Sequence, residues 1–529
     1  MNLSRPGRVF FTKLHAHMKK LLLIAGILCS AISHAQKKNT PPFFAATITA
    51  EDLKKHLYVI ASKEMEGRDT PSPGLDKAAD YIENHFKSLG LLPGNGTSYR
   101  QRYPIYKDSM TSASFRVNGV SFELTKDFQP NLNVNHTAEM RFAEVVFAGY
   151  GIVDGEINAY KDIDVAGKLV LLLDGAPEGY KPSVTGFASP ANAFAKIAKA
   201  QQRGAVAVLL IYGNYPRTTF NNSSSYQLNS YARSLLPETF TVSEAIAEKI
   251  MGEEGKGIIQ KMKKDPLPSK VYKAEIDLAF FKTTRTVYAS NVMALLEGTD
   301  KKDEYVFLTA HYDHVGKRND TTIYYGADDD GSGTVSILEL AEAYAKAKAA
   351  GKGPRRSIVF MTVSGEEKGL WGSEYYGNHP VYPLEKTSVD LNIDMVGRIG
   401  SEYQKDKDST NYIYVIGDDK LSSDLTPITE QVNSKFSKLK LDRKYNDPND
   451  PNRFYFRSDH YNFAERGVPV IFYFNGTHAD YHRPTDTPDK INYTLMSRRA
   501  QLVFLTAWDM ANRDEMLKRD LKLEKPKGF

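Results

Sequence analysis

Apolar residues recur along this chain at two different spacings, and their order predicts alternating helices and strands. Near the start, Leu53, Leu57 and Ile60 follow helical spacing. Residues 75–90 repeat that spacing and finish at Gly90, a residue typical of helix ends. We therefore expect two amphipathic helices before the first strand.

Shorter apolar segments in the following part of the chain predict strands. Residues 114–124 alternate in polarity around Asn118 and Gly119, a pair that favours a hairpin turn. Continuous apolar runs, typical of buried strands, come next at 144–152, 167–175 and 206–213. Residues 214–235 are polar and show no periodicity, so we expect a loop there.

The second half of the chain alternates apolar strands with helices. The expected strands are 306–311, 357–365, 389–397 and 468–474. Residues 334–351 form a strong amphipathic helix pattern, and a closing helix is expected over 493–518. This order predicts an α/β fold with a mixed, mostly parallel sheet sandwiched by helices. Active sites in such sheets gather at the carboxyl ends of the strands.

The first residues have the pattern of an export signal. Two lysines precede an apolar run over residues 21–32, and small residues end at Ala35. We expect residues 1–35 to be removed, and the mature protein to be periplasmic or extracellular. The run is short for a membrane anchor. Lipoprotein cleavage at Cys29 is disfavoured because Leu28 stands where a small residue is needed.

Net charge and cysteine content limit the partners and metal ligands that the chain can have. The chain has 529 residues, and the basic residues of 1–35 account for its whole formal net charge of +5. A neutral mature chain gives no bulk support for a nucleic-acid or anionic-membrane partner. We expect no membrane span after the first forty residues, and the sequence does not indicate an oligomeric state. The single cysteine, Cys29, lies in the export signal, so a metal site would have to use His, Asp and Glu.

Acids and histidines cluster directly after the predicted strands. The residues are His311, Asp313, Glu366, Glu367, Asp394 and His482, with a further acidic loop at 326–333. Taken singly, each has an ordinary explanation, such as a helix cap or a surface histidine. Converging on one sheet edge, however, the carboxylates would repel one another, and divalent cations would neutralise them.

The types of ligand indicate zinc, and their number indicates two ions. Histidine with carboxylate and no sulfur is typical of catalytic zinc. One catalytic zinc takes three protein ligands, whereas at least five are available here. Two ions that share a carboxylate would use all five and leave a position for a bridging water.

At these residues the sequence resembles the co-catalytic di-zinc aminopeptidases, family 28 of the metallopeptidases, which also includes glutamate carboxypeptidases and glutaminyl cyclases. The matching motifs are HYD at 311–313, GADDDGSG at 326–333, SGEEKGLWGS at 364–373, NIDMVG at 392–397, RSDHYNF at 457–463 and DYHRPTDT at 480–487. The resemblance implies a zinc-exopeptidase fold built from 44–141 and 284–529. Residues 142–283 resemble a smaller α/β protease-associated domain inserted between them.

The resemblance also implies the metal ligands. His311 and Asp394 would bind one zinc, Glu367 and His482 the other, and Asp329 would bridge the two. Two Zn²⁺ per chain are therefore expected.

The resemblance assigns catalytic roles to further residues. Glu366 would be the general base that activates the bridging water. Asp313 would hydrogen-bond the imidazole of His311, as metal-bound histidines generally require. Tyr455 lies where a family tyrosine polarises the oxyanion, although Phe454 and Phe456 on either side allow a different alignment.

These inferences predict a secreted di-zinc exopeptidase, a hydrolase that removes residues from the amino end of peptide substrates. Acids dominate around the motifs, which favours an ammonium over a carboxylate. The alternatives are a carboxypeptidase or glutaminyl-cyclase-like enzyme of the same fold, a hydrolase of a non-peptide amide, and a non-catalytic receptor-like binding protein.

Overall fold

The computed structural model describes residues 40–523 except 187–188, 230–234 and 265. The described residues divide into two compact units. The first is formed by the residues up to Tyr103 together with those from Tyr288 onward, and the second by Pro104–Val287. The predicted export signal, residues 1–35, lies outside the described residues. No helix in the described ranges is long and apolar enough to cross a membrane.

The first unit contains the sheet that the C-terminal half of the sequence predicts. In spatial order its strands are β19 (Lys440–Asp442), β18 (Tyr412–Ile416), β20 (Val470–Phe474), β17 (Thr387–Ile393), β13 (Lys301–His311), β16 (Arg356–Val363) and the end of β12 (Lys270–Leu296). The pairs from β20 to β16 are parallel, while β18 with β20 and β16 with β12 are antiparallel. The mixed, mostly parallel sheet is therefore confirmed. Three short strands complete the unit: β1 (Leu92–Pro93), which pairs with β12, and the hairpin β14 (Lys317–Asn319) and β15 (Thr322–Ile323).

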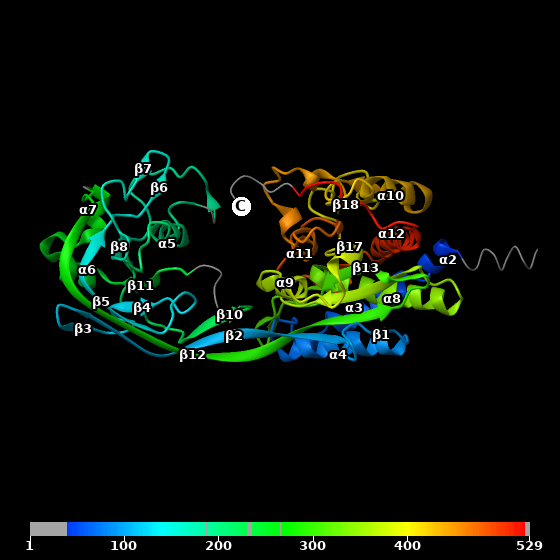
Figure 1. Cartoon of the computed structure of the whole chain (residues 1–529), viewed down its shortest axis with the longest axis horizontal. Helices are drawn as coiled ribbons and strands as arrows, with labels where there is room; N and C mark the ends of the chain where they lie inside the picture. Colours follow the sequence, from blue (N-terminus) through cyan, green and yellow to red (C-terminus); the bar gives the residue numbers. More distant parts are fainter. Residues whose placement is uncertain (1–39, 187–188, 230–234, 265, 524–529) are drawn as a thin grey trace, which may run out of the picture. The chain divides into compact units, whose positions relative to one another are not determined.

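Helices cover both faces of this sheet. They are α2 (Pro41–Ala45), α3 (Ala50–Ile60), α4 (Pro73–Ser88), α8 (Gly333–Ala349), α9 (Trp371–Asn378), α10 (Leu425–Val432), α11 (His460–Ala464) and α12 (Tyr493–Asn512). Successive residues of a strand face opposite sides, and β13 shows this alternation: Val306 and Leu308 belong to the core under α3, α8 and α12, while Phe307 packs with Tyr376 and Phe463 on the other side. Figure 1 shows α3, α4 and α8 grouped together in this unit.

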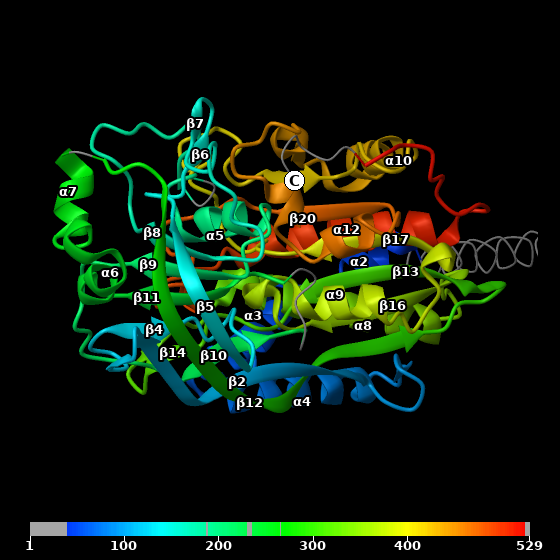
Figure 2. The ribbon, with the colours of Figure 1, turned by 60° about the vertical axis from the view of Figure 1, so that its left-hand side comes forward.

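The second unit has its own apolar cores. Its strands are β2 (Arg100–Val117), β3 (Val120–Phe122), β4 (Phe128–Pro130), β5 (Ala138–Phe147), β6 (Val153–Asp154), β7 (Ile157–Asn158), β8 (Leu169–Leu173), β9 (Ala207–Ile211), β10 (Ser223–Gln227), β11 (Glu238–Val242) and the first part of β12. Its helices are α5 (Ala193–Gln201), α6 (Glu244–Met251) and α7 (Ile258–Lys264). Figure 2 shows β5, β8, β9 and β11, of which β8 and its two neighbours β5 and β9 run parallel.

Two features of this unit differ from the expectation. The unit begins at Pro104, whereas the predicted boundary lay at residue 142, because Phe115 and Phe128 pack into the same core as β5 and β8. Residues 214–235 are not all loop: β10 pairs with β2, and this polar pairing leaves no apolar periodicity in the sequence. The predicted hairpin turn is confirmed, because Val117 pairs with Val120 across Asn118 and Gly119.

Candidate active site

The predicted site residues lie at the carboxyl ends of four neighbouring strands of the first unit. His311 is the last residue of β13, Glu366 and Glu367 follow β16, and Asp394 follows β17. His482 lies in the loop after β20. Since β20, β17, β13 and β16 are adjacent and parallel, their carboxyl ends meet at one edge.

One group of ligand-type atoms surrounds His311. Its Nε2 lies 3.4 Å from Oδ1 of Asp329 and 3.6 Å from Oδ1 of Asp394. Oε2 of Glu366 lies 3.8 Å from the same nitrogen. The structure thus brings together His311, Asp329 and Asp394 in a geometry that could hold a metal ion.

A second group surrounds Glu367 and shares Asp329 with the first. Nε2 of His482 lies 3.0 Å from Oδ2 of Asp329 and 3.0 Å from Oε2 of Glu367. The two oxygens of Asp329 therefore face different groups, as a bridging carboxylate would require. The five predicted metal ligands all belong to these two groups.

His314 belongs to the second group, and sequence reasoning missed it. Its Nδ1 lies 2.9 Å from Oε1 of Glu367, and the side chain is completely buried. Gly326 allows this packing: its φ is +55°, and a Cβ there would lie 2.4 Å from Cγ of His314. The available signal was the second histidine of the HYDH segment, three residues after His311.

The polar atoms of both groups fit metal ions. Several buried atoms make no hydrogen bond within the described structure: Nε2 of His311, Nδ1 and Nε2 of His314, Oδ2 of Asp329, Oε1 of Glu367 and Nε2 of His482. Buried polar atoms are nearly always bonded, so unpaired ones of these chemical types indicate a missing cation. His and carboxylate without sulfur suit zinc.

The electrostatics of the site lead to the same conclusion. Burial raises the pKa of Glu366 well above its usual value, and the neighbouring carboxylates of Glu367 and Asp394 raise it further, although His311 opposes them. Burial alone would lower the pKa of His311, but Glu366 and Asp394 outweigh it and raise that pKa well above its usual range. The carboxylates thus need positive charge beside them, which divalent cations would supply.

Asp328 and Asp330 have different positions from Asp329. Oδ1 of Asp330 accepts hydrogen bonds from the backbone N–H groups of Gly333 (2.8 Å) and Met395 (3.0 Å). Oδ1 of Asp328 accepts one from the N–H of Gly397, at 2.7 Å. Both carboxylates are completely buried, so they fix the loops around the site and cannot contact a substrate.

Asp313 connects the His311 segment to Glu366. Nδ1 of His311 lies 3.1 Å from the main-chain oxygen of Asp313 and 3.5 Å from its Oδ1. The nearest acceptor for the imidazole is therefore the carbonyl rather than the predicted carboxylate. Oδ1 of Asp313 instead accepts a hydrogen bond from the backbone N–H of Glu366, at 3.2 Å.

Arg68 fixes the same segment, and no sequence motif indicated this residue. Its buried guanidinium donates hydrogen bonds to the main-chain oxygens of Tyr312 (2.7 Å), Ile60 (2.8 Å), Tyr325 (2.8 Å) and Gly326 (2.9 Å). Burial lowers the pKa of Arg68 to about 10, although nearby aspartates oppose that change. One side chain thus holds the residues next to His311 and those before the acidic turn.

A pocket opens onto the site, and Tyr481, not Tyr455, lines it. The lining residues are Asp329, Glu366, Asp394, Met395, Phe454, Arg457, Phe472, Phe474, Thr477 and Tyr481. Tyr481 stacks on His482 with ring centroids 3.9 Å apart. Tyr455 lines a different cavity with Asp419 and Lys420, and its buried hydroxyl has no hydrogen-bond partner among the described residues. The prediction therefore selected a tyrosine that the structure does not bring to this pocket.

Arg457 also faces this pocket. Nη2 of Arg457 lies 3.5 Å from the hydroxyl of Tyr481, and its guanidinium lies over the ring of Phe454. Asp459, two residues further along the chain, accepts a hydrogen bond from the Ser373 hydroxyl, at 2.6 Å. The contacts of the Arg457 guanidinium in the pocket are thus with aromatic side chains.

Comparison with known proteins identifies relatives of the segment that contains this site. The family model described as peptidase family M28 matches residues 291–507, a segment that holds every predicted site residue. A "probable leucine aminopeptidase" of Arthroderma otae is 29% identical over 226 residues, which are 42% of this chain and 57% of that protein. A "probable zinc metalloprotease" of Pyrenophora teres is 27% identical over 245 residues, 43% of this chain and 49% of that protein. The chain thus spans about half the length of these curated relatives.

One solved structure supports the fold. The aminopeptidase from Aneurinibacillus sp. strain AM-1 aligns with 92% of this chain and 100% of its own, with a TM-score of 0.52 and 20% sequence identity. The predicted fold class is thereby confirmed.

Proposed function

Residues 291–507 belong to peptidase family M28, and on that premise we propose that this protein is an exported di-zinc aminopeptidase. The observation that carries the proposal is the position of Asp329. Its two carboxylate oxygens face two separate groups of ligands, with Glu366 beside them.

The ligand sets follow from these groups. His311 and Asp394 would hold one zinc, Glu367 and His482 the other, and Asp329 would contact both. Bound there, the zinc pair would supply Lewis acidity and lower the pKa of a coordinated water. The structure adds His314 as a further neighbour of Glu367.

Glu366 would act as the proton carrier. Its carboxylate faces the pocket and makes no hydrogen bond to a protein donor among the described residues. Its backbone N–H is held by Asp313, which fixes its orientation. Glu366 would accept a proton from the attacking water and deliver it to the leaving amine.

The pocket supports a preference for apolar side chains at the cleaved residue. Phe454, Phe472 and Phe474 line it together with Met395. Burying an apolar side chain of the substrate against these residues is favourable, whereas they provide no counter-charge or hydrogen bond for a charged side chain.

The same pocket supports attack at the amino end. Its carboxylates are Asp329, Glu366 and Asp394, and a substrate ammonium would find counter-charge there. The names of the curated relatives, a probable leucine aminopeptidase among them, support the same choice. A carboxypeptidase is the second candidate, because Arg457 lines the pocket and a guanidinium matches a terminal carboxylate.

Peptides blocked at either end test the proposal. With zinc present, a leucine-containing dipeptide should be cleaved when its carboxyl end is amidated and should resist cleavage when its amino end is acetylated. The reverse pattern would identify a carboxypeptidase. The variant Arg457→Ala further distinguishes an aminopeptidase from a carboxypeptidase. It should abolish turnover by a carboxypeptidase, whereas an aminopeptidase should still cleave amidated dipeptides.

Zinc content and turnover together test the two remaining alternative functions. A glutaminyl-cyclase-like enzyme of this family would work with one zinc, and a receptor-like protein would show no turnover. Purified protein that holds fewer than two zinc ions at the candidate active site after growth in ample zinc would contradict the di-zinc proposal.

Export and the inserted unit complete the proposal. Residues 1–35 carry the pattern of an export signal, so the mature chain should begin near Gln36, outside the cytoplasm. Sequencing the amino end of the native protein tests this, and an intact Met1 or Met18 would refute it.

The unit Pro104–Val287 would act as a protease-associated domain that influences substrate choice.

A further inference from the structure

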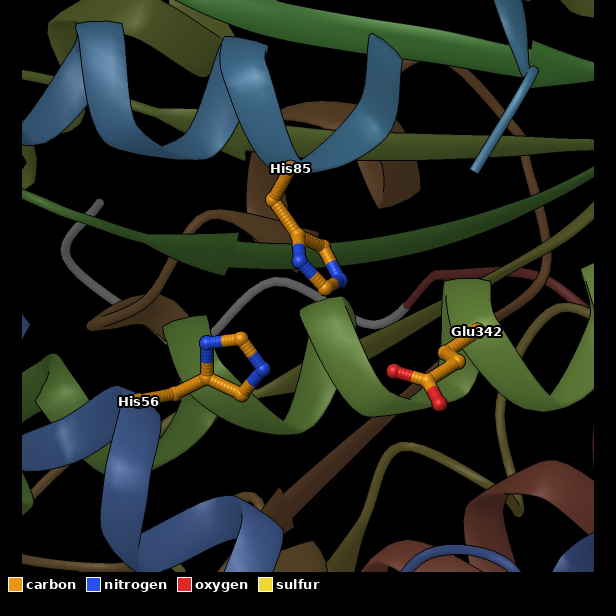
Figure 3. Close-up of side chains that lie close together, drawn as sticks. All are labelled: His56, His85 and Glu342. Atoms are coloured by element: carbon orange, nitrogen blue, oxygen red, sulfur yellow. The ribbon is translucent and has the colours of Figure 1, made fainter. Parts of the chain in front are cut away.

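Three helices of the first unit bring two histidines and a glutamate to one point, away from the residues of the candidate active site. His56 comes from α3, His85 from α4 and Glu342 from α8. One ligand atom from each lies within 4.8 Å of the other two. Figure 3 shows the three side chains pointing toward one another from their helices.

The ring nitrogens are divided in the way metal-binding histidines require. Nδ1 of His56 lies 2.7 Å from the hydroxyl of Tyr81, which leaves its Nε2 facing the cluster. Nε2 of His85 lies 3.4 Å from the main-chain oxygen of Leu338, which leaves its Nδ1. A second interaction that fixes the other ring nitrogen is typical of histidines that bind metals.

A buried carboxylate beside His56 is incompletely paired. Oε1 of Glu339 lies 3.3 Å from Nε2 of His56 but makes no hydrogen bond in the described structure, although only 1% of the residue is exposed. An unpaired buried carboxylate oxygen next to the imidazole of His56 indicates that positive charge belongs here.

We propose that His56, His85 and Glu342 bind one divalent ion of the zinc type, with Glu339 as a neighbouring carboxylate. Two imidazoles and a carboxylate without sulfur form a ligand set that suits zinc. The ion would join α3 and α4 to α8, the helix that begins at Gly333 directly after the turn that carries Asp329. Its role would be structural, and it shares no ligand with the candidate active site.

Zinc titration of the full chain tests this site. Protein stripped by a chelator is titrated with Zn²⁺ against a chromogenic zinc indicator, and the equivalents bound per chain are counted. His85→Asn should bind one equivalent fewer than the wild type, and Glu342→Gln should lose the same equivalent or bind it at least tenfold more weakly. His379→Asn, which removes an exposed histidine of the same unit, is the matched control and should bind as the wild type does.

The design separates this site from the candidate active site. Combined with His482→Asn, the loss caused by His85→Asn should add to the loss at the active site, because the ligands are separate. The expected difference of one equivalent between wild type and His85→Asn also holds if the active site binds fewer ions than proposed.

A second measurement guards against misfolding. Zinc should raise the unfolding temperature of the wild type more than that of Glu342→Gln, a change at a side chain that is 30% exposed and pairs with Lys346 on the same helix. Equal zinc equivalents and equal zinc-dependent shifts in wild type, His85→Asn and Glu342→Gln would overturn the proposal.

Discussion

Nδ1 of His314 lies 2.9 Å from Oε1 of Glu367, inside the group that holds the second set of metal ligands. The side chain of His314 is completely buried and that of Glu367 is 6% exposed, and Nε2 of His314 makes no hydrogen bond within the described structure. His314 therefore either orients Glu367 or takes part in binding the ion.

His314→Ala should weaken zinc at the Glu367 group. Residues that orient a ligand typically contribute about 10- to 100-fold to metal affinity. Competition with a zinc indicator measures the change, and zinc at the His311 group should be retained. Affinity equal to that of the wild type would show that His314 only packs against Glu367.

Glu366→Gln and Glu367→Gln should have different effects although the residues are neighbours. Glu366→Gln keeps the size of the side chain but removes the base, so turnover should fall on the order of 100-fold or more while zinc content stays. Glu367→Gln should mainly reduce zinc content, because Glu367 contacts His482 in the second group. Turnover and elemental analysis on the same samples distinguish them; an active Glu366→Gln would contradict the role of the base.

Tyr481→Phe should reduce turnover, and Tyr455→Phe should not. The hydroxyl of Tyr481 lies at the pocket next to Arg457, so it can donate to a developing oxyanion. Loss of such a donor typically costs on the order of 100-fold in turnover. Steady-state kinetics of both variants provide the test. A greater loss of turnover in Tyr455→Phe than in Tyr481→Phe would support Tyr455, the tyrosine predicted from the sequence.

Arg68→Lys should destabilise the first unit and disturb the site. A lysine cannot reproduce the four hydrogen bonds to main-chain oxygens, so the free energy of unfolding should fall by about 3 kcal/mol. Chemical denaturation measures this. Arg513→Lys, at a partly exposed arginine paired with Asp509, is the control and should change stability little.

His85 should make stability depend on pH when zinc is removed. Its pKa in the folded chain is about 4, against an ordinary value of 6.5. Because the unfolded chain binds the proton more readily, this contribution is present above about pH 6.5 and is lost as the pH falls toward 4. In chelator, the difference in stability between wild type and His85→Asn should shrink over that interval; a constant difference would contradict the lowered pKa.

Much of the site could be predicted from sequence because its residues follow strands. His311, Glu366, Glu367 and Asp394 come directly after apolar runs, and parallel strands bring their carboxyl ends to one edge. That rule needs no knowledge of loop conformation. The apolar periodicity of the strands and of α8 therefore determined both the fold class and the place of these residues.

Loop conformation decided which aspartate and which tyrosine reach the site. Three consecutive aspartates are chemically identical, and the backbone of the turn alone makes Asp329 face the ligands while Asp328 and Asp330 bind main-chain N–H groups. The same holds for the choice of Tyr481 over Tyr455, since each lies in an irregular segment without periodicity.

Some residues belong to no sequence motif, and their positions depend on packing between distant segments of the chain. Arg68 reaches Gly326, and His56 and His85 meet Glu342, only because separate helices pack against one sheet. Sequence determined the strands, the helices and the chemistry available at each strand end. Only tertiary structure decided which buried side chains meet, because that depends on side-chain directions and burial that the local pattern of polarity does not encode.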